Sequence, residues 1–349
     1  MVTIVLDAMG GDEAPAVVVE GALEALREPA VEILLVGPQQ RLAEELRRRD
    51  GLHPRLRVVD ASQVVGMGES PSEAVRHKRD SSISVGLGLI QRGEAQGFVS
   101  AGNSGAVVAA AVAILGLLPG VERPALGAVF RSLAGPLLLL DVGANVSCKP
   151  SHLVQFALMG SVYMERVLGI ARPRVGLLSN GEEPSKGPAV VKAAHRLLRH
   201  QAGVNFVGNV EGKDLPKGTV QVAVTDGFTG NIVLKTSEGM TELFYQMLGD
   251  SFASAPHFAV AGFILKPALK EMAKSLDYSE YGGAPLLGVG GVVVVAHGRS
   301  DAKAIKNAIL VAKHAVEVDA LAALRLEGLS QGPEESRPEG GAGDVHGSA

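Results

Sequence analysis

The 349-residue sequence has a single cysteine, Cys148, and no tryptophan. One cysteine excludes an intramolecular disulfide framework and any cysteine-rich zinc or iron–sulfur site, and it indicates a reducing compartment. Aromatic residues make up only 4%, which argues against a surface that stacks nucleic-acid bases. The histidines are scattered without zinc-ligand spacing, so the sequence indicates no metal site.

Long apolar runs are also missing. The longest, residues 106–118, is well short of the ~20 residues that a membrane span needs. The first residues, MVTIVLDAMGGD, lack the basic head of a signal peptide, so we expect a cytoplasmic protein. A mean hydropathy of +0.22 is high enough to leave membrane contact without spanning open.

Charge and motif absences exclude further classes. Lys and Arg number 33 against 37 Asp and Glu, a net charge of −4, which does not indicate a nucleic-acid partner. The sequence has no G-x-G-x-x-G fingerprint, no Walker lysine and no G-x-S-x-G elbow. Dinucleotide binding and covalent catalysis are therefore not supported.

Short apolar runs alternate with helical patterns along most of the chain, which predicts an α/β fold: a mostly parallel sheet covered by helices on both faces, a three-layer α/β/α sandwich. The expected strands are 2–6, 31–36, 56–59, 97–100, 136–140, 174–178, 204–207, 220–224 and 291–295. The expected helices are 14–26, 39–48, 81–91, 104–115, 151–168, 188–199, 229–248 and 301–324. We predict one catalytic domain over residues 1–327 and a disordered Gly/Pro/Glu/Ser-rich tail over 328–349.

Glycine, at 44 residues, gathers in turns that follow predicted strands, where ligands bind in such sheets. The turns are LDAMGGD (6–12), SAGNSGA (100–106), DVGAN (141–145), SNGEEPSKG (179–187) and TDGFTGN (225–231). Amide groups at the helix starts favour an anion such as phosphate, although ordinary helix caps and core-edge hydrogen bonds explain single turns as well. The candidate binding residues are Asp7, Gly10, Gly11, Asn103, Ser104, Gly105, Asn145, Asn180, Gly227, Thr229 and Gly230.

Residues 251–276 form an amphipathic insertion. Their apolar residues recur at helical spacing and the apolar face is wide, with lysines on the other face and Pro267 expected to kink the helix or to start a second one. Such a face fits either an anionic membrane surface or a dimer-interface or core helix. The candidate membrane contacts are Phe258, Phe263, Ile264, Leu265 and Leu269.

Six segments together resemble the PlsX family of bacterial phosphate acyltransferases. They are LDAMGGDEAP, SAGNSGA, LLDVGANVSCKP, LLSNGEEPSKG, TDGFTGN, and EYGGAPLLGV followed by VAHGRSDAKAIKNAI. The resemblance covers about residues 1–325. It implies a fold similar to isopropylmalate dehydrogenases and phosphotransacetylases, and transfer of a long acyl chain from acyl carrier protein to inorganic phosphate. It further implies a homodimer on the inner face of the cell membrane, no cofactor, and a membrane glycerol-3-phosphate acyltransferase that takes the acyl phosphate into phospholipid synthesis.

Within that reaction, phosphate is expected among the turns 102–105 and 227–231. Lys186 would hold phosphate or stabilise the oxyanion, and Asn231 would donate to the carbonyl oxygen. Asp226 would orient Lys186 or Asn231, and His297 is a further candidate, for protonating the thiolate.

An acidic carrier protein needs a basic docking patch. The candidate patches are Arg76, Lys78 and Arg79, and the helix with His195, Arg196, Arg199 and His200.

Three other readings stay open. One is a phosphotransacylase that uses coenzyme A, and another is a decarboxylating dehydrogenase, although no matching Asp cluster for Mg²⁺ is found. The third is a non-catalytic, membrane-associated scaffold for lipid enzymes, which would not need donor-rich turns after so many strands.

Overall fold

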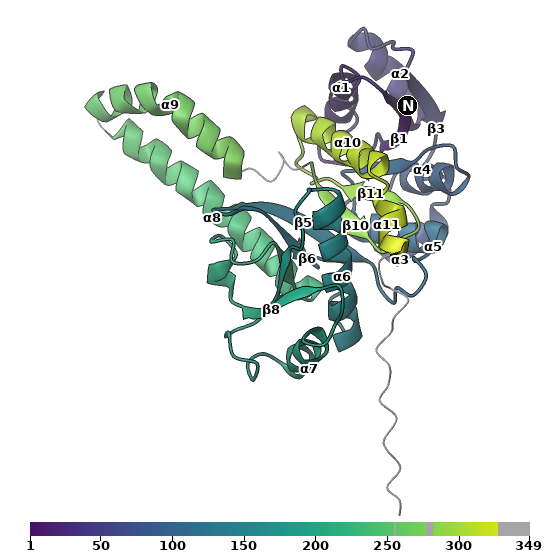
Figure 1. Cartoon of the computed structure of the whole chain (residues 1–349). Helices are drawn as coiled ribbons and strands as arrows, with labels where there is room; N and C mark the ends of the chain where they lie inside the picture. Colours follow the sequence, from purple (N-terminus) through teal and green to yellow (C-terminus); the bar gives the residue numbers. More distant parts are fainter. Residues whose placement is uncertain (255, 277–281, 327–349) are drawn as a thin grey trace, which may run out of the picture.

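The computed structural model describes residues 1–254, 256–276 and 282–326 (Figure 1). The predicted tail, 328–349, lies outside the described residues. The strands are β1 (Val2–Asp7), β2 (Val31–Gly37), β3 (Leu56–Asp60), β4 (Gly97–Ser100), β5 (Ala125–Ser132), β6 (Gly135–Leu140), β7 (Arg174–Leu178), β8 (Asn205–Val210), β9 (Val222–Val224), β10 (Ala284–Leu287) and β11 (Val292–Val295). The helices are α1 (Ala16–Ala25), α2 (Gln39–Arg48), α3 (Pro71–His77), α4 (Ser82–Gln91), α5 (Ser104–Leu115), α6 (Pro150–Arg166), α7 (Ala189–Leu198), α8 (Gly227–Ala253), α9 (Pro256–Leu276), α10 (Ala302–Glu317) and α11 (Ala320–Leu326), with a short 3₁₀ turn at Gly212–Asp214.

All strands belong to one 11-stranded sheet in the order β3-β2-β1-β4-β11-β10-β5-β6-β9-β7-β8. The pairs are parallel except for three at the centre, β11–β10, β10–β5 and β5–β6, which are antiparallel. Because of these reversals, the outer strands β3, β2, β1, β4 and β11 run opposite to β6, β9, β7 and β8. The predicted fold class, a mostly parallel α/β sheet between helices, is confirmed.

The register of the central strands brings the carboxyl ends of both half-sheets to one level. Val295, the last residue of β11, pairs with Ala284 of β10, and the pairing of Leu286 with Leu126, continued along β10, places Ala284 beside Ala128 of β5. On the other side Leu140, the last residue of β6, pairs with Gly127. The turns after β4 and β11 and the turn after β6 therefore all approach the middle of β5.

Helices cover both faces of the sheet. A core cluster on one face joins α3, α4, α5 and α8 to inward side chains such as Phe98 and Leu139. On the other face, α1, α2 and α10 pack over the N-terminal strands, and α6, α7 and α11 over the C-terminal strands. The alternation of side chains explains the two faces: Leu137 and Leu139 of β6 point to the first core, Leu138 and Leu140 to the second.

The helices α8 and α9 form an antiparallel hairpin that projects from the body (Figure 1). The predicted insertion at 251–276 is thus the second arm of a longer feature. A Cβ at Gly262 would lie 2.9 Å from the ring of Phe252, so the missing side chain lets the two helices approach closely. The helix α9 begins at Pro256 and continues through Pro267. Of the two alternatives expected at Pro267, a kink or a second helix, the second is therefore wrong.

Two further expectations differ from the structure. The long helix expected over 301–324 is two helices, α10 and α11, because Asp319 takes a left-handed backbone conformation, φ 50°, between them. The strands β5 and β10 and the helix α3 were not expected. None of the helices in the described ranges combines the length and apolar character that crossing a bilayer requires.

Candidate functional site

The turns after β1, β4 and β11 contact one another. Ser100 donates its hydroxyl proton to the Asp7 carboxylate over 2.7 Å, and the amide of Asp12 donates to the Gly298 carbonyl over 2.8 Å. A Cβ at Gly10 would lie 2.5 Å from the amide nitrogen of Gly102, so only glycine lets these turns meet. Burial raises the pKa of Asp7, while hydrogen bonds from Ser82 and Ser100 act against the rise.

The turn after β6 contacts the start of α8. The fully buried Asp141 carboxylate accepts hydrogen bonds from Leu126, Gly143, Ala144 and Asn145 at 2.7–3.1 Å, which fixes the turn. The Asn145 carbonyl then accepts from the amide of Gly227 over 2.7 Å. A Cβ at Gly230 would collide with the Asp141 carbonyl oxygen. Turn 141–145 and the first turn of α8 are therefore one unit.

These two groups of turns border one cavity of about 370 Å³. Its polar lining includes Ser104 at the start of α5, Asn231 in the second turn of α8, and His297 in the turn after β11. Gly143 and Gly298 contribute backbone. Its apolar lining comes from Met67, Val108, Leu126, Ala128, Val129, Val142, Leu234, Ala284, Val295 and Ala296. The start of α5 provides amide donors at the positive end of a helix dipole.

One face of α8 lines this cavity. Asn231, Leu234, Lys235 and Glu238 follow helical spacing and all border it. Among the predicted residues Ser104, Asn231 and His297 are thus brought together. Lys235 and Glu238 were missed, although their spacing from Asn231 in the sequence could have found them.

His297 is held in a defined orientation. Its Nδ1 accepts a hydrogen bond from the Arg299 amide over 3.1 Å, so the neutral ring carries its proton on Nε2. Its Nε2 lies 3.9 Å from Oε2 of Glu238. Burial lowers the pKa of His297, the cations Arg299 and Lys235 lower it further, and the anions Glu238 and Asp12 oppose this. The imidazole is therefore neutral at neutral pH.

Several predicted residues use their polar atoms to hold the turns. Asn103 caps α5 by accepting from the Ala106 amide, and its Nδ2 donates to the carbonyls of the 66–69 loop. Asn145 donates to Asp141 and to the Pro124 carbonyl. Asp226 caps α8 and accepts from the amide and the hydroxyl of Thr229.

The turn after β7 lies apart from the cavity lining. Asn180 and Lys186 are exposed, and neither borders the cavity. The amide of Lys186 donates to the Glu183 carbonyl, and its side-chain stem lies over Gly181. This turn belongs to β7, which lies beyond β9 from the centre of the sheet.

The chain is similar along nearly its whole length to one protein family. The model of the "fatty acid synthesis protein" family matches residues 2–322. A phosphate acyltransferase of Desulfitobacterium hafniense (strain Y51) is 48% identical over 318 residues, 91% of this chain and 94% of that protein. A phosphate acyltransferase of Anaeromyxobacter sp. (strain Fw109-5) is 50% identical over 344 residues, 97% of this chain and 94% of that protein. The chain belongs to the PlsX family of phosphate acyltransferases.

Solved structures support the same fold. A EutD phosphotransacetylase from Staphylococcus aureus superposes with a TM-score of 0.59 at 17% identity, covering 92% of this chain and 94% of that one. A branched-chain phosphotransacylase from Enterococcus faecalis V583 gives 0.57 at 14% identity, covering 90% and 99%. At these identities the likeness concerns the fold alone.

The prediction of an enzyme, a phosphate acyltransferase with phosphate as one substrate, is confirmed by the relatives. The alternative of a non-catalytic scaffold is therefore excluded.

Cys148 lies close to the site: its Sγ is 3.9 Å from the Asn145 carbonyl oxygen. Burial and the nearby carboxylates of Asp141 and Asp226 raise the pKa of its thiol to about 12. The thiol is protonated at neutral pH and is a poor nucleophile, which agrees with transfer that involves no covalent enzyme intermediate.

One acidic cluster, Glu182, Glu211 and Asp214, groups carboxylate oxygens within 4.8 Å of one another. Lys213 pairs with Glu211, and Lys217 pairs with Asp214 at 2.9 Å. These lysines neutralise part of the negative charge, so the cluster is accounted for by ion pairs.

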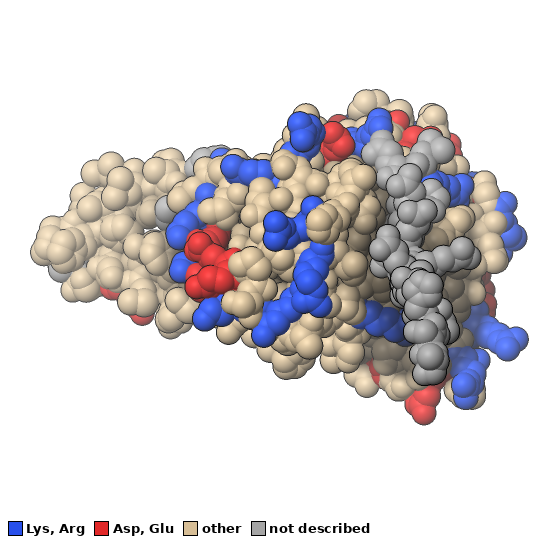
Figure 2. Space-filling model, turned by 60° about the horizontal axis from the view of Figure 1, so that its bottom comes forward, with Lys and Arg blue, Asp and Glu red and all other residues tan. Residues whose placement is uncertain are grey.

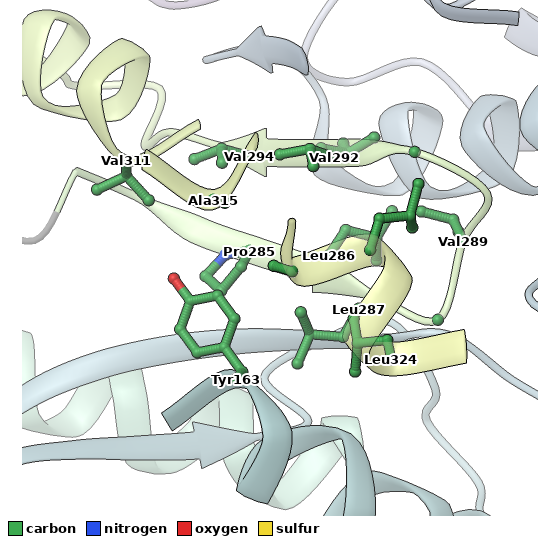
Figure 3. A pocket seen from close by; sticks show the side chains of 15 residues that line it. Tyr163, Pro285, Leu286, Leu287, Val289, Val292, Val294, Val311, Ala315 and Leu324 are labelled. Carbon is green, nitrogen blue, oxygen red and sulfur yellow. The ribbon is translucent and has the colours of Figure 1, made fainter. Parts of the chain in front are cut away.

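A second cavity, of about 30 Å³, lies between β10, β11, α10 and α11. Figure 3 shows aliphatic side chains of these elements and the ring of Tyr163 from α6 around it. Burial raises the pKa of Tyr163, so its hydroxyl stays neutral. Because its lining is aliphatic, the space is a dry packing gap.

Proposed function

We propose that this enzyme transfers a long-chain fatty acyl group from acyl carrier protein to inorganic phosphate, and that the acyl phosphate serves phospholipid synthesis. The observation that supports it is the single cavity of about 370 Å³, which combines the amide-rich start of α5 with an apolar wall. Phosphate needs the amide donors at the helix start, and a fatty chain needs the apolar wall.

The reaction balances without a co-reactant. A phosphate oxygen attacks the thioester carbonyl carbon, a carbon–oxygen bond forms, and the carbon–sulfur bond breaks. The proton of monohydrogen phosphate ends on the thiol of the carrier. The enzyme must position the two reactants and stabilise the negative charge on the carbonyl oxygen.

Phosphate is placed at the start of α5, where Ser104 adds a hydroxyl donor. Asn231 provides a neutral amide for the carbonyl oxygen. The His297 Nε2–H borders the same cavity and is proposed to donate a hydrogen bond to the departing thiolate, which takes its proton from the phosphate.

Lys186 is proposed as a cation for phosphate or the oxyanion, with Asp226 as its orienting residue. Since Lys186 is exposed and outside the cavity lining, this role requires loop 179–187 to carry it over the cavity. Lys235 already borders the cavity and is a second cation for phosphate.

The donor is proposed to be acyl carrier protein, which is acidic, so it should dock on exposed basic side chains. Arg76 and Arg79 beside α3 and Arg196 and Arg199 on α7 are exposed. Lys78 is instead bound to Glu69 and to the Val64 carbonyl. His195 is buried, with Nδ1 2.9 Å from Oδ1 of Asn209, so neither Lys78 nor His195 is offered to a partner.

The membrane role is proposed for α9. Phe263 and Ile264 are 78% and 69% exposed, and Phe258 and Leu265 about half exposed, while Leu269 is half-buried. In Figure 2 the free end of the hairpin, at the left, is drawn almost wholly in tan, with few charged side chains on that face. Apolar side chains at a projecting tip favour insertion into a membrane surface, close to the membrane acyltransferase that would receive the product.

The homodimer is proposed to form along α8. Large apolar side chains are exposed along this helix: Phe228, Ile232, Met240, Leu243, Phe244 and Met247. In the proposed homodimer, a second copy of the chain buries these side chains in a self-complementary interface.

The deciding measurement is release of carrier thiol from long-chain acyl carrier protein with and without phosphate, beside the same assay with acyl coenzyme A. Phosphate-dependent release from the carrier substrate is expected. Release from coenzyme A alone would favour the second candidate, a phosphotransacylase, which the fold of the phosphotransacetylase neighbours allows.

A further inference from the structure

The central cavity is larger than phosphate requires. An apolar cavity of about 150 Å³ holds benzene, so about 370 Å³ holds about 15 non-hydrogen atoms on the same scale. Phosphate accounts for five of them. Space for about ten further atoms remains, and much of the wall around it is aliphatic.

The depth of the cavity comes from short side chains on the central strands. Ala128 and Ala284 lie beside each other in the register of β5 and β10, and Val295 of β11 continues the row. Their neighbours Leu126 and Leu286 on the same strands are larger; both are buried, and Leu126 also lines the cavity. Because the two alanines have short side chains, they leave space between the sheet and α8. Leu234 of α8 lines this space on the side opposite the alanines.

The polar groups of the cavity occupy other elements. Ser104 comes from the start of α5, and His297 from the turn after β11, while Lys235 and Glu238 come from α8. The floor on β5 and β10 contributes aliphatic side chains and glycine backbone among the residues the structure describes. A thioester held at the polar groups can therefore extend its hydrocarbon chain over this floor.

We propose that the row Ala128–Ala284 is the floor of an acyl-chain subsite that selects substrates by chain length. This inference rests on the proposed acyl transfer and specifies the part of the cavity that receives the hydrocarbon. Each methylene that enters is expected to raise kcat/KM about fourfold, the contribution of one buried methylene. The gain stops when the space is full, so kcat/KM rises with chain length and then levels off.

The test is a chain-length profile with acyl carrier proteins whose acyl chains run from about 4 to about 16 carbons in steps of about two. Ala128→Leu adds three carbons to the floor. It is expected to move the plateau about three carbons shorter and to lower kcat/KM for the long chains about 60-fold, while the shortest chains stay within about twofold.

A second variant acts in the opposite direction and does not depend on the first one folding. Leu234→Ala removes three carbons from the roof, so the plateau is expected to move to longer chains. Ala128→Ser is the matched control, because it changes polarity at the floor with little volume and should keep the wild-type plateau position. If either size variant moves the plateau as described, the subsite is supported.

Failure of this inference is distinct from failure of the proposed function. A wild-type enzyme that releases no thiol from any acyl carrier protein in the presence of phosphate would overturn the proposed function. An active wild type whose profile is unchanged in both size variants would overturn the subsite alone.

Discussion

Nε2 of His297 lies 3.9 Å from Oε2 of Glu238, and the two residues join the turn after β11 to the middle of α8. The Arg299 amide fixes the other ring nitrogen. The proton on Nε2 is therefore on the side of the ring near Glu238, and both residues border the cavity where the thioester is proposed to lie. The predictions below begin from this pair.

Glu238→Gln removes an anion that raises the pKa of His297. The wild-type pKa is already lowered from 6.5 because burial favours the neutral ring. Protonation of Nδ1 breaks the hydrogen bond from the Arg299 amide that orients the ring, so activity is expected to fall only below that pH. In the variant the acid limb of kcat/KM is expected to move to still lower pH. Glu242→Gln, which removes the partner of Arg299 on the same helix, is the control. An acid limb that moves to higher pH in Glu238→Gln would contradict this account.

Protonation of His297 also affects stability. The folded pKa is lowered from 6.5, so between that lower value and pH 6.5 the unfolded chain binds more protons than the folded one. The free energy of unfolding is expected to fall as the pH decreases through this window. Urea unfolding at pH 7 and pH 5 should show a smaller loss in His297→Gln than in the wild type, and an equal loss would argue against a buried neutral imidazole.

Asn231→Ala is expected to lower kcat by about 10²–10³, the usual effect of removing one donor to an oxyanion. The measurement is steady-state thiol release at saturating phosphate. Thr236→Ala changes an exposed residue of the same helix and should leave kcat within about twofold. A folded Asn231→Ala enzyme with normal kcat would exclude this role.

The two lysines can be separated by their effects on phosphate. Lys235→Ala is expected to raise the KM for phosphate about tenfold, because the cavity wall loses a charge-assisted hydrogen bond from the lysine ammonium to phosphate. Lys186→Ala is expected to lower kcat/KM by at least about 10², if its loop brings the ammonium to the reactants. Near-normal turnover in a folded Lys186→Ala enzyme refutes that role and leaves Lys235 as the cation.

Cys148→Ser should keep kcat within about twofold of the wild type. The thiol, with a pKa of about 12, is not ionised during turnover. Alkylation of the wild type with iodoacetamide should accordingly be slow at pH 7, as followed by mass spectrometry. A loss of more than about tenfold in the serine variant would point to a direct role.

Leu265→Glu on α9 is expected to abolish flotation with anionic liposomes, because a carboxylate enters the apolar tip. Leu133→Glu is the matched control, because it adds the same charge to a residue that is 91% exposed on the turn between β5 and β6 and belongs to neither α8 nor α9. Both variants should keep thiol-release activity with a carrier substrate in solution. Unchanged flotation of Leu265→Glu would remove the membrane role from α9.

The sequence was sufficient for the parallel parts of the fold. Strands such as Arg174–Leu178 and helices such as Ser104–Leu115 have the predicted bounds, because a buried parallel strand is a short apolar run and its helix begins at a clear cap. The strands β5 and β10 escaped this reasoning. They are the antiparallel strands at the centre, and nothing in a β–α alternation indicates that two such segments, far apart in sequence, pair with each other.

The candidate site was predictable to the same extent. Turns that follow parallel strands were expected to be near one another, and Ser104, Asn231 and His297 do border one cavity. The turn with Lys186 follows a strand of the same half-sheet, but one farther from the centre, so its position depends on strand order. Strand order is set by tertiary pairing, which composition and periodicity do not encode.

The antiparallel pairing of β10 with β5 has a consequence for biosynthesis. Leu286 and Leu126, which pair across it, are separated by nearly half of the 349-residue chain, and the floor of the cavity cannot close until the ribosome has released both. Until then β4 and β5 present unpaired edges, and unpaired edge strands are prone to associate with other chains. The enzyme therefore depends on its last strands to seal the sheet as well as to complete the cavity.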